Sequence, residues 1–199
     1  MHADDAHPPA DLDRNIQTRR SLRSFSDQAV SPETLRALFE AARWAASCFN
    51  EQPWRFVYAT REQPQEFDRL LQCLGEYNQG WAREAPVLIL TLASKHFAKN
   101  QKVNRHAEHD LGLAMGNLSL QAVSLGLFVH EMAGFDAAKA VQDLGVPEEF
   151  SAVTMATIGY PGPPENLSEN LREKETAPRE RKALSEIVFR GTFGAQDGL

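Results

Sequence analysis

Apolar residues recur along much of the chain at the spacing of one helix face. Ser31-Pro32-Glu33 supplies a capping hydroxyl, a proline suited to the first helical position and an acid, so it predicts a helix start. Gly126 is well placed to end a long helix, and Asp136 to begin one that runs to Gly145. The predicted helix faces lie at 35–42, 67–74 and 111–125.

Shorter apolar runs predict strands between these helices. Residues 87–93 (VLILTLA) are apolar throughout, which predicts a central strand covered on both faces. Further strands are predicted at 55–59, 128–132, 152–158 and 187–189. Helices and strands mix without a regular βαβ rhythm, which favours an α+β fold.

The region after Gly159 contrasts with the rest of the chain. Residues 159–183 are rich in proline and read as irregular, and so long a structureless segment inside one domain needs an explanation. An arm that reaches across a partner subunit is one. We expect a disordered tail at 1–10 and one domain over 11–199, because 199 residues fit a single domain.

Composition and charge exclude several classes of function. The net charge of −6 argues against nucleic acid, since phosphate backbones require a basic surface. The acidic N-terminus has no apolar core for a signal peptide, and no apolar run approaches the ~20 residues that span a bilayer. The two cysteines form no C-x-x-C motif, which suits the reducing cytoplasm where we expect the protein.

Common catalytic motifs are absent from the sequence. It contains no G-x-G-x-x-G after a strand, no Walker A loop and no G-x-S-x-G elbow. His130-Glu131 opens like a zinc-protease motif, but Gly134 stands where the second histidine would be, so no metal site is predicted. A bound nucleotide would therefore be held in another way than in a Rossmann fold.

Four short segments remain as candidates, and each also fits a purely structural role. The cluster at 19–23 suits phosphate, since guanidinium groups bind it bidentately, but it could be a solvated helix end. The loop at 46–54 could hydrogen-bond a heterocycle or simply form a turn. Residues 130–136 would let a ligand approach the backbone at a glycine or form a plain turn. Residues 179–181 hold two arginines that point the same way if the segment is extended.

Taken together and in order, these segments resemble the nitroreductase and flavin reductase family. The resemblance covers nearly the whole chain after residue 14. The segments that carry it are RRSLRSF at 19–25, ASCFNEQPWRF at 46–56, EYNQGWAREAPVLIL at 76–90, DLGLAMGNLSLQAVSLGL at 110–127, HEMAGFD at 130–136, IGYP at 158–161 and RERKALSEIV at 179–188.

The resemblance implies a bound flavin mononucleotide (FMN) in a cleft at a dimer interface. It also implies a central mixed or antiparallel sheet flanked by helices, with a C-terminal arm exchanged between subunits. Arg19 and Ser21 would contact the phosphate and ribityl end. Arg20 stands where the family often has histidine, which leaves its role open. Arg23 would reach the N1/O2 edge of the ring, where the reduced flavin carries negative charge.

The other expected contacts come from three segments. Asn78 would bind the pyrimidine edge, and the backbone of Ala133 and Gly134 would approach N5 and O4 of the ring. The resemblance assigns phosphate binding also to Arg179 and Arg181. A loop of the other subunit would contact the same flavin through Ala46, Ser47, Cys48 and Asn50. Cys48 stands where the family often has serine.

The implied activity is two-electron transfer from NADH or NADPH through flavin N5 to a small acceptor, by a ping-pong mechanism. The acceptor could be a nitroaromatic, a quinone or free flavin. No dedicated acid or base is needed, so no catalytic residue is assigned. His106 and His130 could donate a proton or be structural, and Phe49, Trp81 and Phe97 could line the acceptor pocket or pack in the core.

Two other functions compete with this one. A flavin-binding or redox-sensing protein would keep the phosphate arginines and lose nicotinamide access. A dehalogenating or ring-cleaving relative would need extra lid segments, for which this chain is too short.

Overall fold

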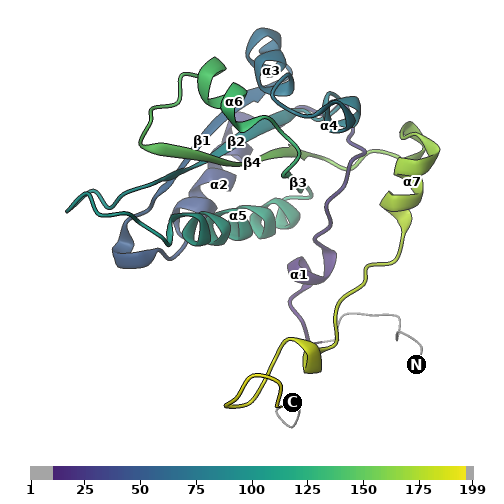
Figure 1. Ribbon diagram of the computed structural model, residues 1–199. Coiled ribbons are helices and arrows are strands. Elements are labelled where there is room, and N and C mark those ends of the chain that lie inside the picture. Colours follow the sequence, from purple (N-terminus) through teal and green to yellow (C-terminus); the bar gives the residue numbers. More distant parts are fainter. Residues whose placement is uncertain (1–10, 196–199) are drawn as a thin grey trace.

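A four-stranded sheet lies at the centre of the chain in the computed structural model, which describes residues 11–195. All its neighbouring strands are antiparallel (Figure 1). The tail predicted at 1–10 lies outside the described residues. In spatial order the strands are β1 (Trp54–Thr60), β2 (Val87–Ser94), β4 (Phe150–Gly159) and β3 (Phe128–Met132).

Helices cover both faces of this sheet, which confirms the predicted α+β fold (Figure 1). One face carries α2 (Pro32–Arg43) and α5 (Ala107–Ser124). The opposite face carries α3 (Pro64–Leu71), α4 (Glu76–Ala82) and α6 (Ala137–Asp143). Among the described residues, no helix is both long and apolar enough to cross a membrane.

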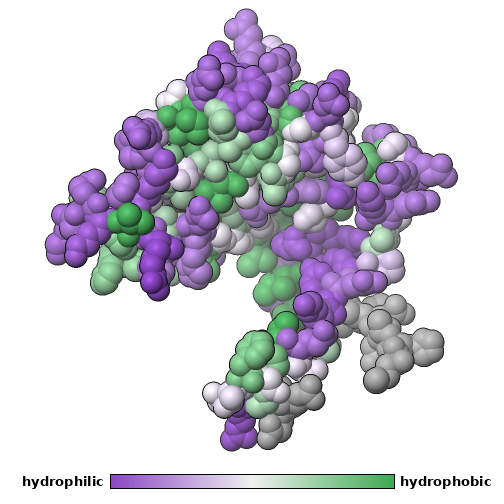
Figure 2. All heavy atoms as spheres, viewed as in Figure 1, coloured by the Kyte–Doolittle hydropathy of each residue, from purple (hydrophilic) through white to green (hydrophobic). Residues whose placement is uncertain are grey.

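The segments at both ends of the described residues lie outside the layers of this body (Figure 1). The N-terminal side has α1 (Arg14–Thr18). The C-terminal arm, defined here as residues 160–195, has η2 (Pro164–Asn166), α7 (Glu169–Thr176) and η3 (Leu184–Glu186). The arm projects from the body and carries apolar residues near its end (Figure 2). Leu184, Ile187 and Phe193 are exposed by 59%, 57% and 91%, which leaves an apolar surface without cover in the single chain.

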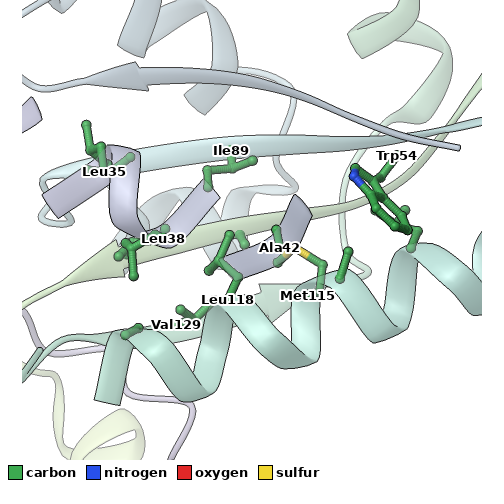
Figure 3. Close-up of a cluster of buried hydrophobic side chains, with 14 of the residues drawn as sticks. Leu35, Leu38, Ala42, Trp54, Ile89, Met115, Leu118 and Val129 are labelled. Atoms are coloured by element: carbon green, nitrogen blue, oxygen red, sulfur yellow. The ribbon is translucent and has the colours of Figure 1, made fainter. Parts of the chain in front are cut away.

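Strand β2 divides the core between the two faces of the sheet. Val87 and Ile89 pack with α2 and α5, whereas Leu88 and Leu90 pack with α3 and α4. The alternation follows from the period of two along a strand. Figure 3 shows the first of these clusters, with Leu118 of α5 reaching toward the strands. The prediction of a strand buried on both faces is confirmed.

Local signals in the sequence set several element ends correctly. The Ser31 hydroxyl accepts a hydrogen bond from the Thr34 N–H at 3.2 Å and starts α2. The Asp136 carboxylate accepts from the Lys139 N–H at 2.9 Å and starts α6. Gly126 follows α5 with a φ of 78°, in the left-handed region that glycine adopts without strain.

Other sequence predictions were wrong, and tertiary contacts explain why. Leu74 is not on the face of α3; it follows the helix and pairs with Phe135 in an isolated bridge. The region after Gly159 is not wholly irregular, because α7 forms there from charged helix formers that show no apolar period. The strand predicted at 187–189 is absent, since no strand among the described residues lies beside it to pair with. Helix α4 was not predicted at all.

Candidate functional site

Two groups of arginines that lie about 160 residues apart in the sequence line one cavity. One group follows α1, and the other follows α7 on the C-terminal arm. The cavity has a volume of about 270 Å³. It is lined by Arg19, Arg20, Ser21, Arg23, Lys174, Glu175, Ala177, Pro178, Arg179 and Arg181. The structure thus brings together the two segments that the sequence suggested for phosphate binding.

Arginine side chains tie the two segments to each other through backbone carbonyls. Arg20 donates from Nη2 to the carbonyl oxygens of Glu175 and Ala177, at 3.0 and 2.8 Å. In the reverse direction, Arg179 donates from Nη1 to the carbonyl of Arg19 at 2.7 Å and from Nη2 to that of Gln17. These reciprocal bonds give Arg20 a structural role. The sequence had left its role open, because the family often has histidine at this position.

The crowding of positive charge in this cavity suits an anion. Burial lowers the pKa of Arg179, and the nearby guanidinium groups of Arg20, Arg181 and Arg19 lower it further. Arg19 lies beside the Ser21 hydroxyl, with 3.4 Å between Nη1 and Oγ. A phosphate group carries close to two negative charges near neutral pH and accepts several charge-assisted hydrogen bonds. The donors present therefore fit a phosphate monoester.

Arg23 lies at the inner end of the arginine group, against two aromatic rings. Its guanidinium carbon is 5.9 Å from the centre of the Trp81 ring, and Trp81 packs on His130 with 4.6 Å between ring centres. His130 donates from Nδ1 to the carbonyl of Leu22 at 3.1 Å. Trp81 is only 2% exposed, which favours its interpretation as a core residue.

His130 is held neutral by its surroundings. Burial, followed by the charge of Arg23, lowers the pKa of His130 from 6.5 to about 4. A neutral ring whose Nδ1 proton is bound to a carbonyl supports the Arg23 segment structurally. The interpretation of His130 as a structural histidine is the one that its contacts favour.

This neutral histidine predicts a specific sensitivity to acid. As the pH falls, the unfolded chain protonates His130 near 6.5 and the folded chain only near 4. The stabilisation is therefore complete above about pH 6.5 and is lost toward pH 4, by about 3 kcal/mol at most. Urea unfolding at a series of pH values measures this loss. The His130→Gln variant, which keeps a donor for the carbonyl, should lose less stability over the same window. An equally steep loss would assign the effect to other groups.

Asn78 and Gly134, from two different elements, contact each other at the edge of the sheet. Asn78 of α4 donates from Nδ2 to the Gly134 carbonyl at 3.0 Å, and the Gly75 N–H donates to the same oxygen at 3.0 Å. A Cβ at Gly134 would lie 2.8 Å from Asn78 Nδ2. A larger residue here would displace the Asn78 amide from this contact. Ala133 and Gly134 are both exposed.

The loop at 46–50 lies elsewhere in the same chain. The Cys48 N–H donates to the buried Asp110 carboxylate at 2.9 Å, near the start of α5. Asn15 of α1, beside the arginine group, instead lies in a groove with Gln121 near the end of α5. Eleven residues of helix separate these two points by roughly 16 Å. One chain therefore does not bring Ala46, Ser47, Cys48 and Asn50 to the arginine cavity.

The same loop is unusual in its backbone and its exposure. Phe49 and Asn50 have φ values of 54° and 56°, in a region that a bulky side chain rarely adopts. Phe49 is 90% exposed, so the interpretation of it as a core residue is wrong. Its ring contacts that of Phe97, with 6.0 Å between centres. The loop thus displays an aromatic side chain and polar groups outward from the chain.

A comparison with known families decides the identity of the fold. The model of the family described as "Nitroreductase family" matches residues 16–160, well over half of the chain. The chain belongs to the nitroreductase family. It is therefore an oxidoreductase, and the resemblance drawn from the sequence is confirmed.

Individual members of the family agree with this assignment. A protein of Streptomyces coelicolor that carries the name NADH dehydrogenase/NAD(P)H nitroreductase is 29% identical over 73% of this chain and 81% of its own. A solved structure described as an oxidoreductase containing FMN is 30% identical, with a TM-score of 0.90 over 98% of this chain and all of the other. A nitroreductase family protein from Streptococcus pneumoniae, 22% identical with a TM-score of 0.72, supports the fold alone.

Two charged residues that line the arginine cavity were not predicted from the sequence. Glu175 and Lys174 lie in a run of charged residues on α7 that reads as a solvated surface. Glu175 is nevertheless only 8% exposed, because the arm folds back onto the segment at 19–24. No local sequence signal predicts that the arm folds back onto this segment, so the Glu175 carboxylate could not be singled out from the sequence.

Proposed function

We propose that the protein binds FMN and catalyses two-electron transfer from NADH or NADPH to a small organic acceptor. The observation that supports this most strongly is the cavity in which arginines from both ends of the chain converge. Arg19, Ser21, Arg179 and Arg181 would hold the phosphate and ribityl end. The FMN named for the similar solved structure supports the choice of nucleotide.

The ring of the flavin would lie against the contacts next to this cavity. Arg23 would place its positive charge beside N1 and O2, Asn78 would bind the pyrimidine edge, and the backbone of Ala133 and Gly134 would face N5. When bound, FMN would supply the redox chemistry of a two-electron transfer. Reductant and acceptor would use the same place in turn, which makes the reaction ping-pong.

The residues of the chain would bind and orient, and no side chain is assigned as an acid or base. His130 is neutral and its Nδ1 proton is bound to a carbonyl, so it does not serve as the proton source. The charge of Arg23 would favour the anionic form of the reduced flavin. The acceptor, whether a nitroaromatic, a quinone or free flavin, would be selected by the shape of the pocket.

The active form would be a homodimer with two shared sites. The loop at 46–50 lies too far from the arginine cavity of its own chain, and it displays polar groups outward. The apolar end of the C-terminal arm is exposed at Leu184, Ile187 and Val188. A two-fold dimer accounts for both: each subunit lends its loop to the flavin of the other and lays its arm across the partner.

The experiment that tests this function is a visible spectrum of the purified protein, followed by anaerobic addition of NADH and of NADPH separately. Yellow protein that bleaches with either nucleotide is the expected result. Yellow colour that persists with both would favour a flavin-binding or sensing protein without turnover. Colourless protein that takes up no added FMN would contradict the proposal.

A further inference from the structure

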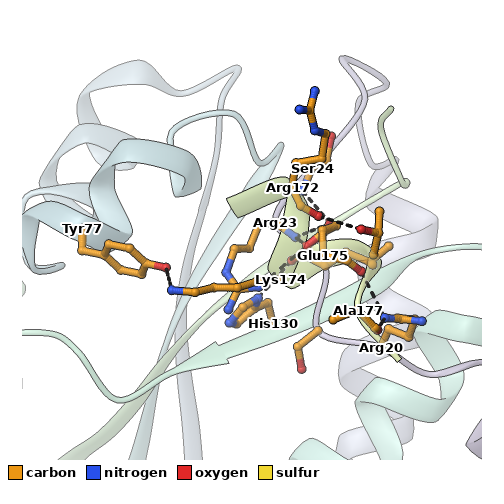
Figure 4. A network of polar contacts seen from close by, with 12 residues as sticks. Arg20, Arg23, Ser24, Tyr77, His130, Arg172, Lys174, Glu175 and Ala177 are labelled. Atoms are coloured by element: carbon orange, nitrogen blue, oxygen red, sulfur yellow. Dashed lines mark hydrogen bonds and ion pairs between the residues drawn. The ribbon is translucent and has the colours of Figure 1, made fainter. Parts of the chain in front are cut away.

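Glu175 is a buried carboxylate in the middle of the arginine cavity. It lies on α7 of the C-terminal arm, and its side chain is 4% exposed. Figure 4 shows it between Arg23 and Ser24, which come from the opposite end of the sequence. A buried carboxylate loses the hydration that stabilises it in water, so its partners must repay that cost.

The partners of Glu175 are the backbone and the side chain of the Arg23 segment. Its Oε1 accepts from the N–H groups of Arg23 and Ser24 at 2.8 and 3.0 Å, and its Oε2 also lies 3.0 Å from the Arg23 N–H. Oε2 is 3.8 Å from Nη1 of Arg23. The carboxylate thus fixes both the main chain at Arg23 and the direction of its guanidinium group.

Other contacts fix α7 in the same place. Arg20 and Arg179 exchange hydrogen bonds between the arm and the segment at 17–20. The Ser24 hydroxyl donates to the Pro163 carbonyl at 2.7 Å. The ammonium group of Lys174 lies 5.5 Å from the centre of the Tyr77 ring on α4 (Figure 4). The position of Glu175 is therefore set by the docking of the whole arm.

These hydrogen bonds alone do not explain why the side chain of residue 175 is a charged carboxylate. A glutamine could accept from both N–H groups at a lower desolvation cost. What a glutamine could not do is offset the positive charge of Arg23 in a cavity that already holds five other cations. The carboxylate therefore sets how much positive charge Arg23 presents to a ring beside it.

We propose that Glu175 is a positioning residue for the flavin: it fixes Arg23 at the edge of the ring and moderates the charge that Arg23 presents there. The inference rests on the proposed binding of FMN. Because Glu175 belongs to the arm, the docking of the arm and the reduction potential of the flavin are linked through this one carboxylate.

The first test compares reduction potentials of the flavin-loaded protein. Glu175→Gln keeps an acceptor and removes the charge, so it should favour the reduced over the oxidised flavin about tenfold, a rise of about 30 mV for a two-electron couple. Arg23→Ala should shift the potential in the opposite direction. Glu173→Gln, an exposed residue of the same helix, makes the same change of net charge and should leave the potential unchanged. An unchanged or lower potential in loaded Glu175→Gln would overturn the inference.

The second test does not depend on the flavin. Glu175→Ala leaves the Arg23 and Ser24 N–H groups without their acceptor, so amide hydrogen exchange there should be at least tenfold faster than in the wild type, whereas Glu175→Gln should stay slow. Unchanged exchange in the alanine variant would overturn the positioning role. Faster exchange in a protein that takes up no FMN would instead reject the proposed function and leave the contact standing.

Discussion

Replacing both Arg179 and Arg181 with alanine is expected to give folded protein that is mostly free of flavin. Both side chains line the arginine cavity, and each charge-assisted hydrogen bond to a phosphate contributes about 1.5–3 kcal/mol. Losing two such contacts should weaken FMN binding by about 100-fold or more. The bound flavin is measured from the visible absorbance per protein, and folding from circular dichroism.

The matched control for this experiment lies on the same arm. Arg172 and Arg190 are exposed and do not line the cavity, so replacing both with alanine removes the same charge without touching the site. This control should retain its flavin. Because Arg179 also donates to the carbonyls of Gln17 and Arg19, the single Arg181→Ala variant separates lost anion binding from a loosened segment. Full flavin content in the double variant would show that the phosphate lies elsewhere.

Ending the chain after Lys182 is expected to abolish the dimer and, as a consequence, the bound flavin. This truncation keeps Arg179 and Arg181 but removes the exposed apolar residues of the arm, among them Leu184 and Ile187. We expect the dimer interface to exceed about 2,000 Å², as in obligate dimers. A folded monomer would then be scarcely populated, and loss of flavin and dissociation would be coupled.

Light scattering and flavin fluorescence over a dilution series measure this coupling. The intact protein should have a mass of about 44 kDa, twice the 22.2 kDa of one chain, and should release flavin only as it dissociates. The truncated protein should be monomeric and colourless. A stable, flavin-loaded monomer of the intact chain would exclude shared sites, even if the assignment of FMN remained.

Much of the fold could be predicted from the sequence because short-range chemistry decides it. The helix starts at Ser31 and Asp136 and the helix end at Gly126 depend on groups within four residues of one another. The unbroken apolar run of β2 is enough to place that strand in the centre of the sheet. The short segments that resemble the nitroreductase family, taken in their order along the chain, were enough to name that family.

The sequence could not predict the features that depend on contacts between segments far apart in the chain. Residues 187–189 have the apolar composition of a strand, but a strand exists only where a neighbour pairs with its backbone, and no neighbour does so between residues 11 and 195. Helix α7 has no apolar period: Leu171 packs against the core, and the other contacts that hold the helix are polar. Sequence reasoning misses such an element for the same reason that it misses the buried Glu175.

The sequence by itself therefore determined the fold class, the main helices and strands, and the two arginine groups that we propose as a phosphate site. Only the tertiary structure decided that these two arginine groups share one cavity, that Arg20 and Arg179 also tie the segments together, and that Glu175 faces Arg23. The physical reason is range: caps and strand periods act within a few residues, whereas the charge in the cavity is the sum of groups that folding brings together from about 160 residues apart.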